Sequence, residues 1–396
     1  MSKTALTPQS RLRGLVANLS WKPAVDALCA LVAGLGVGAI LMAVFGYDPL
    51  KAYVGLYQGS FGNPARFADT LFNATPLVLT GLTFAIGVRA GLFNIGAQGQ
   101  MLLGAIAVVA VGTLPVGDWI QPHALATVVH MTLALGAAMA LGALYSLPAA
   151  LLKITRGVHE VISTIMLNWI AVWLVRFLAV RVLADPVRAE KTISMPDTAQ
   201  LATIVARSDL THALWISLAF AVLIYWVLWH LPAGYGLRST GLNLDATRYA
   251  GINPRKSMNL AFILGGCAAG LAGATQILGR PPIYAMYTDL STLASFGFDG
   301  IAVALLGRNH PLGIIFGAVF FGALNAGTRM MQYQAQVPFE MARVIQGIIV
   351  LAVAIPALGR IVYGWFPKAG VKDESAGGAA QSLSDESVDS AQQTRG

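Results

Sequence analysis

RAGLFNIGAQGQ, residues 89–100, is a polar, glycine-broken stretch between two long apolar runs of the chain. It carries Asn94, Gln98 and Gln100 together with three glycines. Backbone amide and carbonyl groups at membrane depth must be paired, because hydrocarbon offers them no hydrogen-bond partner. Such a stretch therefore lies buried in protein or lines a path for something polar, and it favours transport over other functions.

The composition of the whole chain supports a membrane protein. Of its 396 residues, 56% are hydrophobic and only 11% are charged, whereas soluble proteins carry about 25% charged residues. The net charge of +8 comes from basic residues that stand singly at the ends of apolar runs, which indicates cytoplasmic flanks and not a nucleic-acid surface. Cys29 and Cys267 lie inside apolar runs as small hydrophobes, and the six histidines lack the spacing of metal ligands.

The apolar runs predict about ten transmembrane helices, each long enough to cross roughly 30 Å of hydrocarbon. The first run is too long for the core of a signal peptide, so we expect it to be a retained span. An even number of spans with the N-terminus inside places both termini in the cytoplasm, and most basic residues then fall on that side. The expected spans are 24–45, 74–90, 91–113, 123–152, 157–182, 213–232, 258–279, 291–308, 312–334 and 339–363.

The chain then divides into three parts. Residues 1–23 form a cytoplasmic N-terminal segment, residues 24–367 the transmembrane domain, and residues 368–396 a tail rich in Gly, Ala, Ser, Gln and Asp. The tail has no periodic apolar residues with which to bury surface, so we expect it to be disordered.

Two loops stand out within the transmembrane domain. Residues 46–73 place several aromatic residues among glycines and a few charges, as is common at the outer interface. Residues 233–257 form the largest cytoplasmic loop, and within it Asn243 to Ala250 predicts a short helix that ends at Gly251. This helix is either a docking element for another protein, through Leu244, Thr247 and Tyr249, or part of a solvated turn.

A second glycine-rich stretch echoes the first. Residues 295–301, SFGFDGI, introduce an apolar run much as residues 92–98 do in the first half. Ten spans divided five and five give halves of opposite orientation. Inverted repeats place their broken helices near the membrane midplane, at the site of transport.

Motifs for chemistry are missing from the sequence. There is no G-x-x-x-x-G-K-[ST] phosphate loop and no G-x-S-x-G or H-E-x-x-H motif, so the chain is expected to be a transport subunit and not an enzyme. Asp26 and Glu160 stand at the starts of spans, where the helix dipole favours an acid. Asp299, surrounded by glycine and phenylalanine, is the acid that points most to a functional role.

Four motifs in order carry a family resemblance, which covers roughly residues 24–365. Together they resemble the permease subunits of ABC importers in the branched-chain amino acid, ribose and nucleoside group, and specifically its nucleoside and simple-sugar branch. One departure is Gln98, where that signature commonly has an acid; if that acid contributes to an ion pair, the pair is absent here. The motifs are residues 91–104 (GLFNIGAQGQMLLG), 159–170 (HEVISTIMLNWI), 236–252 (GLRSTGLN…ATRYAGI) and 296–307 (FGFDGIAVALLG).

The resemblance implies an all-α membrane protein, a type II ABC importer permease with two inverted repeats of five helices, in the bacterial cytoplasmic (inner) membrane. It implies a second, related permease subunit in a heterodimer, an ATP-binding cassette protein with two fused cassettes, and an extracytoplasmic substrate-binding protein. No cofactor is expected on this chain, since ATP and magnesium would bind the partner ATPase. Nucleosides or purines are the leading substrates, followed by a simple sugar such as ribose and then by branched-chain amino acids.

The mechanism that the resemblance implies is alternating access, with the binding protein docking on the outer face around 46–73 and 183–212. The alternative is a stand-alone secondary transporter driven by a proton or sodium gradient, which would not need a cytoplasmic docking helix. The translocation path is expected along Asn94, Gln98, Asn168, Phe296, Phe298 and Asp299, with Asn325 a further candidate; for each, helix packing is the competing role. Coupling to the ATPase is expected through Gly241, Leu242, Asn243, Ala246, Arg248, Tyr249, Gly251 and Ile252.

Overall fold

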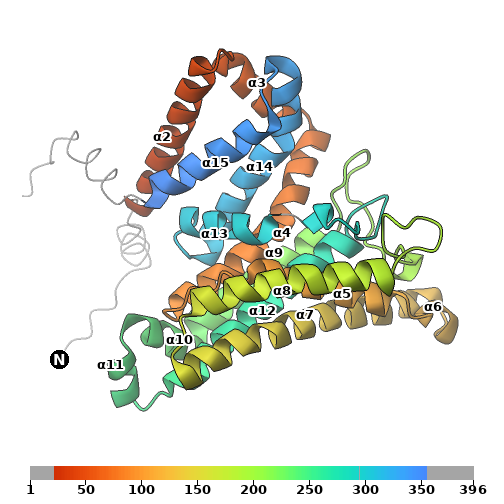
Figure 1. Ribbon diagram of the computed structural model, residues 1–396, viewed down its shortest axis with the longest axis vertical. Helices are drawn as coiled ribbons and strands as arrows, with labels where there is room; N and C mark the ends of the chain where they lie inside the picture. The colour runs from red at the N-terminus through yellow and green to blue at the C-terminus, as the bar shows by residue number, and fades with distance from the viewer. Residues whose placement is uncertain (1–21, 294, 355–396) are drawn as a thin grey trace, which may run out of the picture. The chain divides into compact units, whose positions relative to one another are not determined.

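The computed structural model describes residues 22–293 and 295–354 (Figure 1), and within these residues it is helical without a named β-strand. The expected N-terminal and C-terminal segments, 1–23 and 368–396, lie outside the described residues except for Lys22 and Pro23. The helices are α2 (Lys22–Val44), α3 (Pro49–Phe61), α4 (Pro64–Arg89), α5 (Ala97–Gly112), α6 (Val116–Trp119), α7 (His123–Arg156), α8 (Glu160–Arg181), α9 (Ala213–His230), α10 (Pro232–Leu242), α11 (Leu244–Tyr249), α12 (Pro254–Leu278), α13 (Phe296–Leu306), α14 (Pro311–Ala335) and α15 (Phe339–Ala354), with 3₁₀ turns at Asp197–Ala199 and Ser291–Leu293.

Six of these helices are long and apolar enough to cross a membrane, namely α4, α7, α8, α9, α12 and α14. Shorter apolar helices occupy Leu31–Val44, Ala97–Gly112 and Phe296–Leu306. Every one of the ten expected spans overlaps a helix. The described part of the chain therefore has the helices of a polytopic membrane protein, whereas the span number, the repeats and the side of the termini stay predictions.

The expectation of a loop at residues 46–73 is wrong, because this segment is mostly helical. Asp48 caps α3 by accepting from the backbone N–H groups of Leu50 and Lys51, and Pro49 follows at the first position of the helix. Asn63 caps α4 in the same way, ahead of Pro64. A side-chain oxygen at the N-cap and proline just inside are strong helix starts, and they place the start of α4 ten residues before the expected one.

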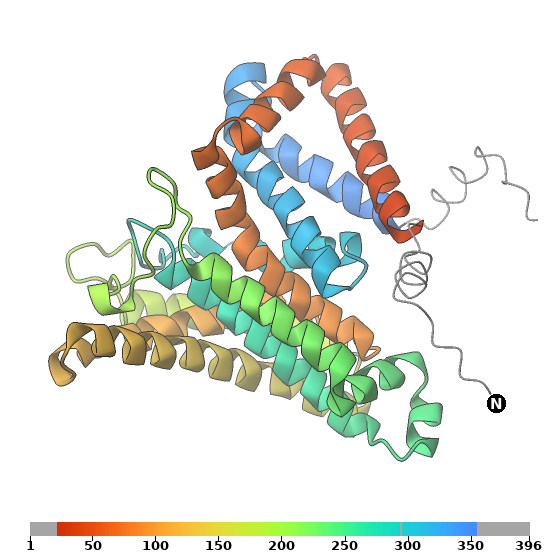
Figure 2. The same ribbon diagram turned by 180° about the vertical axis from the view of Figure 1, so that it is seen from behind.

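The helices form two groups that meet at α4. Helices α5, α7, α8 and α12 lie side by side in one group, whereas α2, α3, α14 and α15 pack in the other, and α4 contacts both α12 and α14 (Figures 1 and 2). Glycines allow the closest approach: a Cβ at Gly142 in α7 would come within 2.8 Å of the Gly270 Cα in α12. Small residues are the usual means of bringing helix backbones together in a membrane.

Candidate functional site

The stretch from Arg89 to Gln100 is a break between two helices, as the sequence indicated. Helix α4 ends at Arg89, the chain turns at Gly91 with φ +74°, and α5 does not begin until Ala97. Asn94 stabilises the turn by accepting from the Gly96 N–H at 3.0 Å. The amides of Asn94 and Gln100 also pair with each other at 3.2 and 3.3 Å, and both side chains are buried.

Asn168 holds the same break from α8. Its Oδ1 accepts from the Gly99 N–H at 2.8 Å, and its Nδ2 donates to the Ile95 carbonyl at 2.9 Å. An amide suits this position because it can donate and accept at once. Asn168 thus satisfies one backbone group on each side of the start of α5, where the helix itself cannot.

Gln98 connects the two glycine-rich stretches. Its Nε2 donates to the Leu293 carbonyl and its Oε1 accepts from the Gly297 N–H, both at 2.9 Å. Gly297 lies in the first turn of α13 and directly against Gln98, where a Cβ would not fit. In this conformation Asn94, Gln98 and Asn168 are therefore buried and hydrogen-bonded, and they hold the break together.

A polar cavity of about 200 Å³ lies beside this break, between α4, α13, α14 and α15. Three residues considered in the sequence line it: Phe296, Asp299 and Asn325. Phe298 does not line it, and its side chain is 48% exposed. The remaining wall is largely polar and comprises Asn73, Arg280, Ser291, Thr292, Ser295, Thr328, Arg329, Phe339, Ala342, Arg343 and Gln346.

Three arginines, Arg280, Arg329 and Arg343, make this cavity basic, which the sequence did not reveal. Arg280 donates to Gln276 Oε1 and to the Thr292 carbonyl, both at 3.2 Å, and Arg343 lies over the Phe339 ring at 5.6 Å. They come from three different segments, so no local spacing in the sequence connects them. Charge, amide and aromatic groups thus face one space, which suits a polar solute with a flat ring.

Two acids, Asp299 and Asp209, lie on or near this cavity. Asp299 Oδ2 accepts from the Ser295 hydroxyl at 3.1 Å. Near this region, burial and the Asp69 carboxylate raise the pKa of Asp209, and the Arg280 and Arg329 guanidinium groups partly oppose that rise. On the wall itself, Gln346 Nε2 donates to Asn325 Oδ1 at 2.9 Å.

The expectation of a loop at 233–257 with one short helix is wrong in part, because Pro232–Leu242 forms a further helix, α10. The predicted short helix itself is confirmed as α11. Asn243 caps it by accepting from the N–H groups of Asp245 and Ala246, and Gly251 follows it with φ +77°. Leu242 and Tyr249 are 88% and 94% exposed, which is unusual for large apolar side chains. Thr247 is instead buried and donates to the Asn243 carbonyl at 2.7 Å, so it is not available for docking.

Gly241 brings this loop against the opening stretch. Its Cα lies so close to the backbone of Arg89 and Gly91 that a Cβ there would overlap the Arg89 carbonyl oxygen. Gly251, by contrast, has open space around it, and only its backbone conformation favours glycine. The other expected coupling residues Asn243, Ala246 and Arg248 are exposed, and Ile252 is half-buried.

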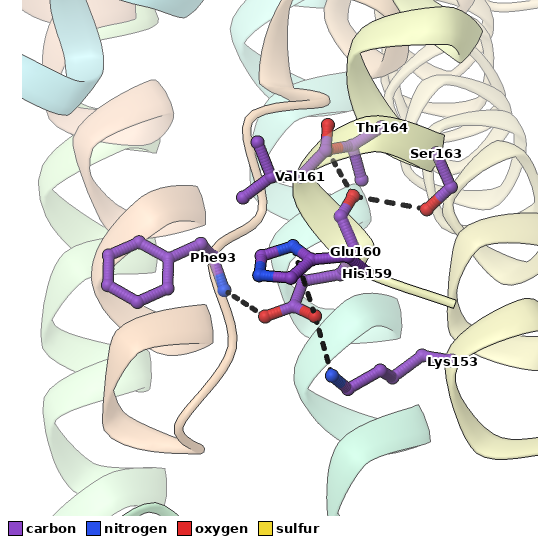
Figure 3. A network of polar contacts seen from close by, with 7 residues as sticks. All are labelled: Phe93, Lys153, His159, Glu160, Val161, Ser163 and Thr164. Carbon is purple, nitrogen blue, oxygen red and sulfur yellow. Dashed lines mark hydrogen bonds and ion pairs between the residues drawn. The ribbon is translucent and has the colours of Figure 1, made fainter. Parts of the chain in front are cut away.

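Glu160 closes the network on the other side of the break (Figure 3). Its Oε2 forms an ion pair with Lys153 Nζ at 2.8 Å, and its Oε1 accepts from the Phe93 N–H at 3.3 Å. His159 Nδ1 lies 4.0 Å from the same carboxylate. Glu160 stands in the first turn of α8, where an acid is favoured, and it ties α7 and α8 to the turn after Gly91.

Replacing Glu160 by glutamine is expected to lower the stability of the protein by about 1–2 kcal/mol. The amide keeps the bond from Phe93 but loses the charge opposite Lys153, which at 27% side-chain exposure can turn to solvent. Unfolding of purified Glu160→Gln in detergent measures the loss. The matched control is Asp245→Asn, whose ion pair with Arg248 is exposed on both sides and contributes little. Equal stability of the two variants would contradict the prediction.

Comparison with known proteins identifies the family. The model of the family described as branched-chain amino acid transport system, permease component, matches residues 66–354. The guanosine ABC transporter permease protein NupP of Bacillus subtilis is 36% identical over 87% of this chain and 96% of its own length. The nucleoside ABC transporter permease protein NupB of Lactococcus lactis is 30% identical over 83% and 90%, and the glucose ABC transporter permease protein TsgB13 of Haloferax volcanii 28% over 84% and 87%.

Two of these relatives have a second similar permease protein in the same organism. A second guanosine permease protein of B. subtilis, NupQ, and a second nucleoside permease protein of L. lactis, NupC, are also similar to this chain, at 29% and 26% identity. The match to the family model covers most of the described helices, including the break, the cavity and α11. The chain therefore belongs to the branched-chain amino acid transport permease family, and it is a membrane-embedded permease subunit of an ABC importer.

Proposed function

We propose that this subunit forms half of the translocation path of a bacterial inner-membrane importer for nucleosides, with purine nucleosides as the preferred cargo. The observation that carries the proposal is the cavity beside the break, where Phe296, Asp299, Asn325 and three arginines face one space. Carboxylate and amide groups suit ribose hydroxyls and base edges, and aromatic and guanidinium planes suit the face of a base. The names of NupP and NupB favour a nucleoside, and that of TsgB13 supports a simple sugar as the second candidate.

The partners follow from the same proposal. We place a second, related permease opposite this one, as the NupP/NupQ and NupB/NupC pairs suggest. ATP and magnesium would bind a separate ATPase with two fused cassettes, docked on α11, and an extracytoplasmic binding protein would deliver the solute near α3 and the 183–212 loop. ATP-driven rigid-body movement of the two permeases would open the path to one side at a time.

Competition for uptake tests the substrate. Cells that depend on this system should take up labelled guanosine, and unlabelled nucleosides should compete whereas ribose and glucose should not. A calorimetric titration of the partner binding protein with the same solutes gives an independent result, since that protein usually makes the selection. Competition by glucose alone would support a simple sugar as the substrate in place of a nucleoside.

Cysteine labelling tests whether the cavity lies on the path. In a background without Cys29 and Cys267, Asp299→Cys is expected to react with a charged thiol reagent, because Asp299 lines the cavity. Asn94→Cys should stay unmodified in the conformation described, since Asn94 is only 2% exposed. A transported nucleoside should slow the reaction at position 299. Failure of Asp299→Cys to react in any nucleotide state would remove Asp299 from the path.

A further inference from the structure

A second pocket, of about 370 Å³, lies at the other end of α4, away from the cavity described above. Its seven lining residues are Val88, Arg89, Arg238, Gly241, Leu242, Arg308 and Asn309, three of them arginines and none of them acidic. They come from the end of α4, from α10 and from the turn between α13 and α14. Transport of a solute does not require a basic pocket at this position.

Two of the arginines share one aromatic ring. The guanidinium carbon of Arg89 lies 5.4 Å from the centroid of the Trp229 ring and that of Arg238 lies 5.8 Å from it. Stacking on the indole stabilises each cation, but it also holds two like charges close together, which is unfavourable without an anion between them. Arg89 Nε donates to the Asn309 carbonyl at 3.0 Å, whereas Arg238 Nε is buried without a hydrogen-bond partner among the described residues.

The acids of neighbouring described segments do not supply that anion. Glu160 is paired with Lys153 at 2.8 Å, and Asp245 with Arg248 at 3.2 Å. Neither carboxylate lines the pocket. No acid among the lining residues thus offsets the charges of Arg89 and Arg238, which favours a negative group from outside the described residues.

The surroundings of the pocket are those of a membrane–water boundary. Tyr225 stacks on Trp229 at 5.2 Å, and His310 packs against the same indole at 4.8 Å. Along α9, Val222 and Trp226 lie on the helical face of Tyr225 and Trp229 by their spacing, and they are 60% and 50% exposed. Aromatic residues gather at headgroup level in membrane proteins, and an exposed apolar helix face beside them suits acyl chains.

We propose that this pocket binds the phosphate of an anionic phospholipid headgroup, held between Arg89 and Arg238, with the acyl chains along the Val222–Trp226 face of α9. Guanidinium groups bind phosphate through paired, charge-assisted hydrogen bonds, and basic pockets between membrane helices are known to take such headgroups. Gly241 and Leu242 line the same pocket, so a bound lipid would lie directly beside the contact between α10 and the turn at Gly91.

Lipid titration of the purified transporter tests the site. The full complex is delipidated in detergent and titrated with phosphatidylglycerol, with phosphatidylcholine and, separately, with inorganic phosphate, and the thermal unfolding midpoint is recorded. Phosphatidylglycerol should raise the midpoint in a saturable way and phosphatidylcholine should not. Arg238→Gln should raise the half-saturating concentration of phosphatidylglycerol about tenfold, because a charge-assisted hydrogen bond is lost.

The matched control is Arg156→Gln, an exposed arginine at the end of α7 that does not line the pocket; it should respond as the wild type does. If Arg238→Gln does not fold, Arg238→Lys is the second variant, because it keeps the charge without the planar fork. Phosphatidylglycerol should raise its unfolding midpoint less than it raises that of the wild type. Equal stabilisation by inorganic phosphate would support the phosphate site and overturn its assignment to lipid. An unchanged response to phosphatidylglycerol in both Arg238 variants would overturn the site.

Discussion

Replacement of Gln98 by glutamate is expected to destabilise the protein by about 2–4 kcal/mol and to reduce uptake strongly. The carboxylate can still accept from the Gly297 N–H, but it cannot donate to the Leu293 carbonyl, which Gln98 Nε2 now satisfies at 2.9 Å. It also introduces a charge at a position that is only 7% exposed. Uptake should fall because Gly297 lies in the first turn of the helix that carries Phe296 and Asp299 to the cavity.

Two further variants separate the causes of this loss. Gln98→Met removes both hydrogen bonds without adding charge, so it should be less harmful than the glutamate variant if the charge dominates. Gln332→Glu makes the same chemical change at an exposed position of α14 and should leave stability unchanged. Lower pH should reduce the loss of stability in Gln98→Glu, because a protonated carboxyl can donate to the Leu293 carbonyl. If Gln98→Glu is as stable as the wild type at neutral pH, the hydrogen bonds of Gln98 to Leu293 and Gly297 do not stabilise the protein as proposed.

The same residue shows how far sequence can go at this site. Glycines and amides in an apolar chain predicted a break at residues 89–100, because glycine permits the turn and amide side chains can pair with the freed backbone groups. The sequence pattern does not distinguish an amide that contacts the solute from one that hydrogen-bonds to backbone groups, since the residue type is the same for both. The partners of Gln98 are some 195 and 199 residues away in the chain, and no local signal marks them.

Strong caps alone did not decide which elements the sequence predicted. Asn243 and Gly251 bracket α11 in the sequence as they do in the structure. Helix α3 was missed because glycines and tyrosines made residues 46–73 look like an interfacial loop, although Asp48-Pro49 and Asn63-Pro64 are helix starts. Arg280, Arg329 and Arg343 were missed for another reason. Arg280 follows the expected span 258–279, whereas Arg329 and Arg343 lie inside the expected spans 312–334 and 339–363, and only tertiary packing brings the three to one cavity.

The loop that carries α11 leads to the last expected result, which concerns Gly241. Gly241→Val is expected to reduce ATP-driven uptake about tenfold or more, since overpacking at a close contact typically costs about 1–3 kcal/mol. The new side chain would overlap the Arg89 carbonyl and the Gly91 backbone, and must push α10 away from the turn that leads into the break. The ATPase of the reconstituted complex should continue, because the exposed surface of Leu242 and Tyr249 remains available for docking.

Gly251→Ala tests the other end of α11 by a different physical route. It has open space around it, so the cost is the left-handed backbone at φ +77° and not a clash. Gly157→Ala is the matched control, because Gly157 also has φ +68° and open space but lies in the turn between α7 and α8. Uncoupling in Gly241→Val and Gly251→Ala with normal uptake in Gly157→Ala would assign the effect to the α10–α11 loop. Equal losses of uptake and ATPase in all three would instead indicate general destabilisation, and normal uptake in Gly241→Val would mean that the contact with Arg89 and Gly91 does not transmit the movement.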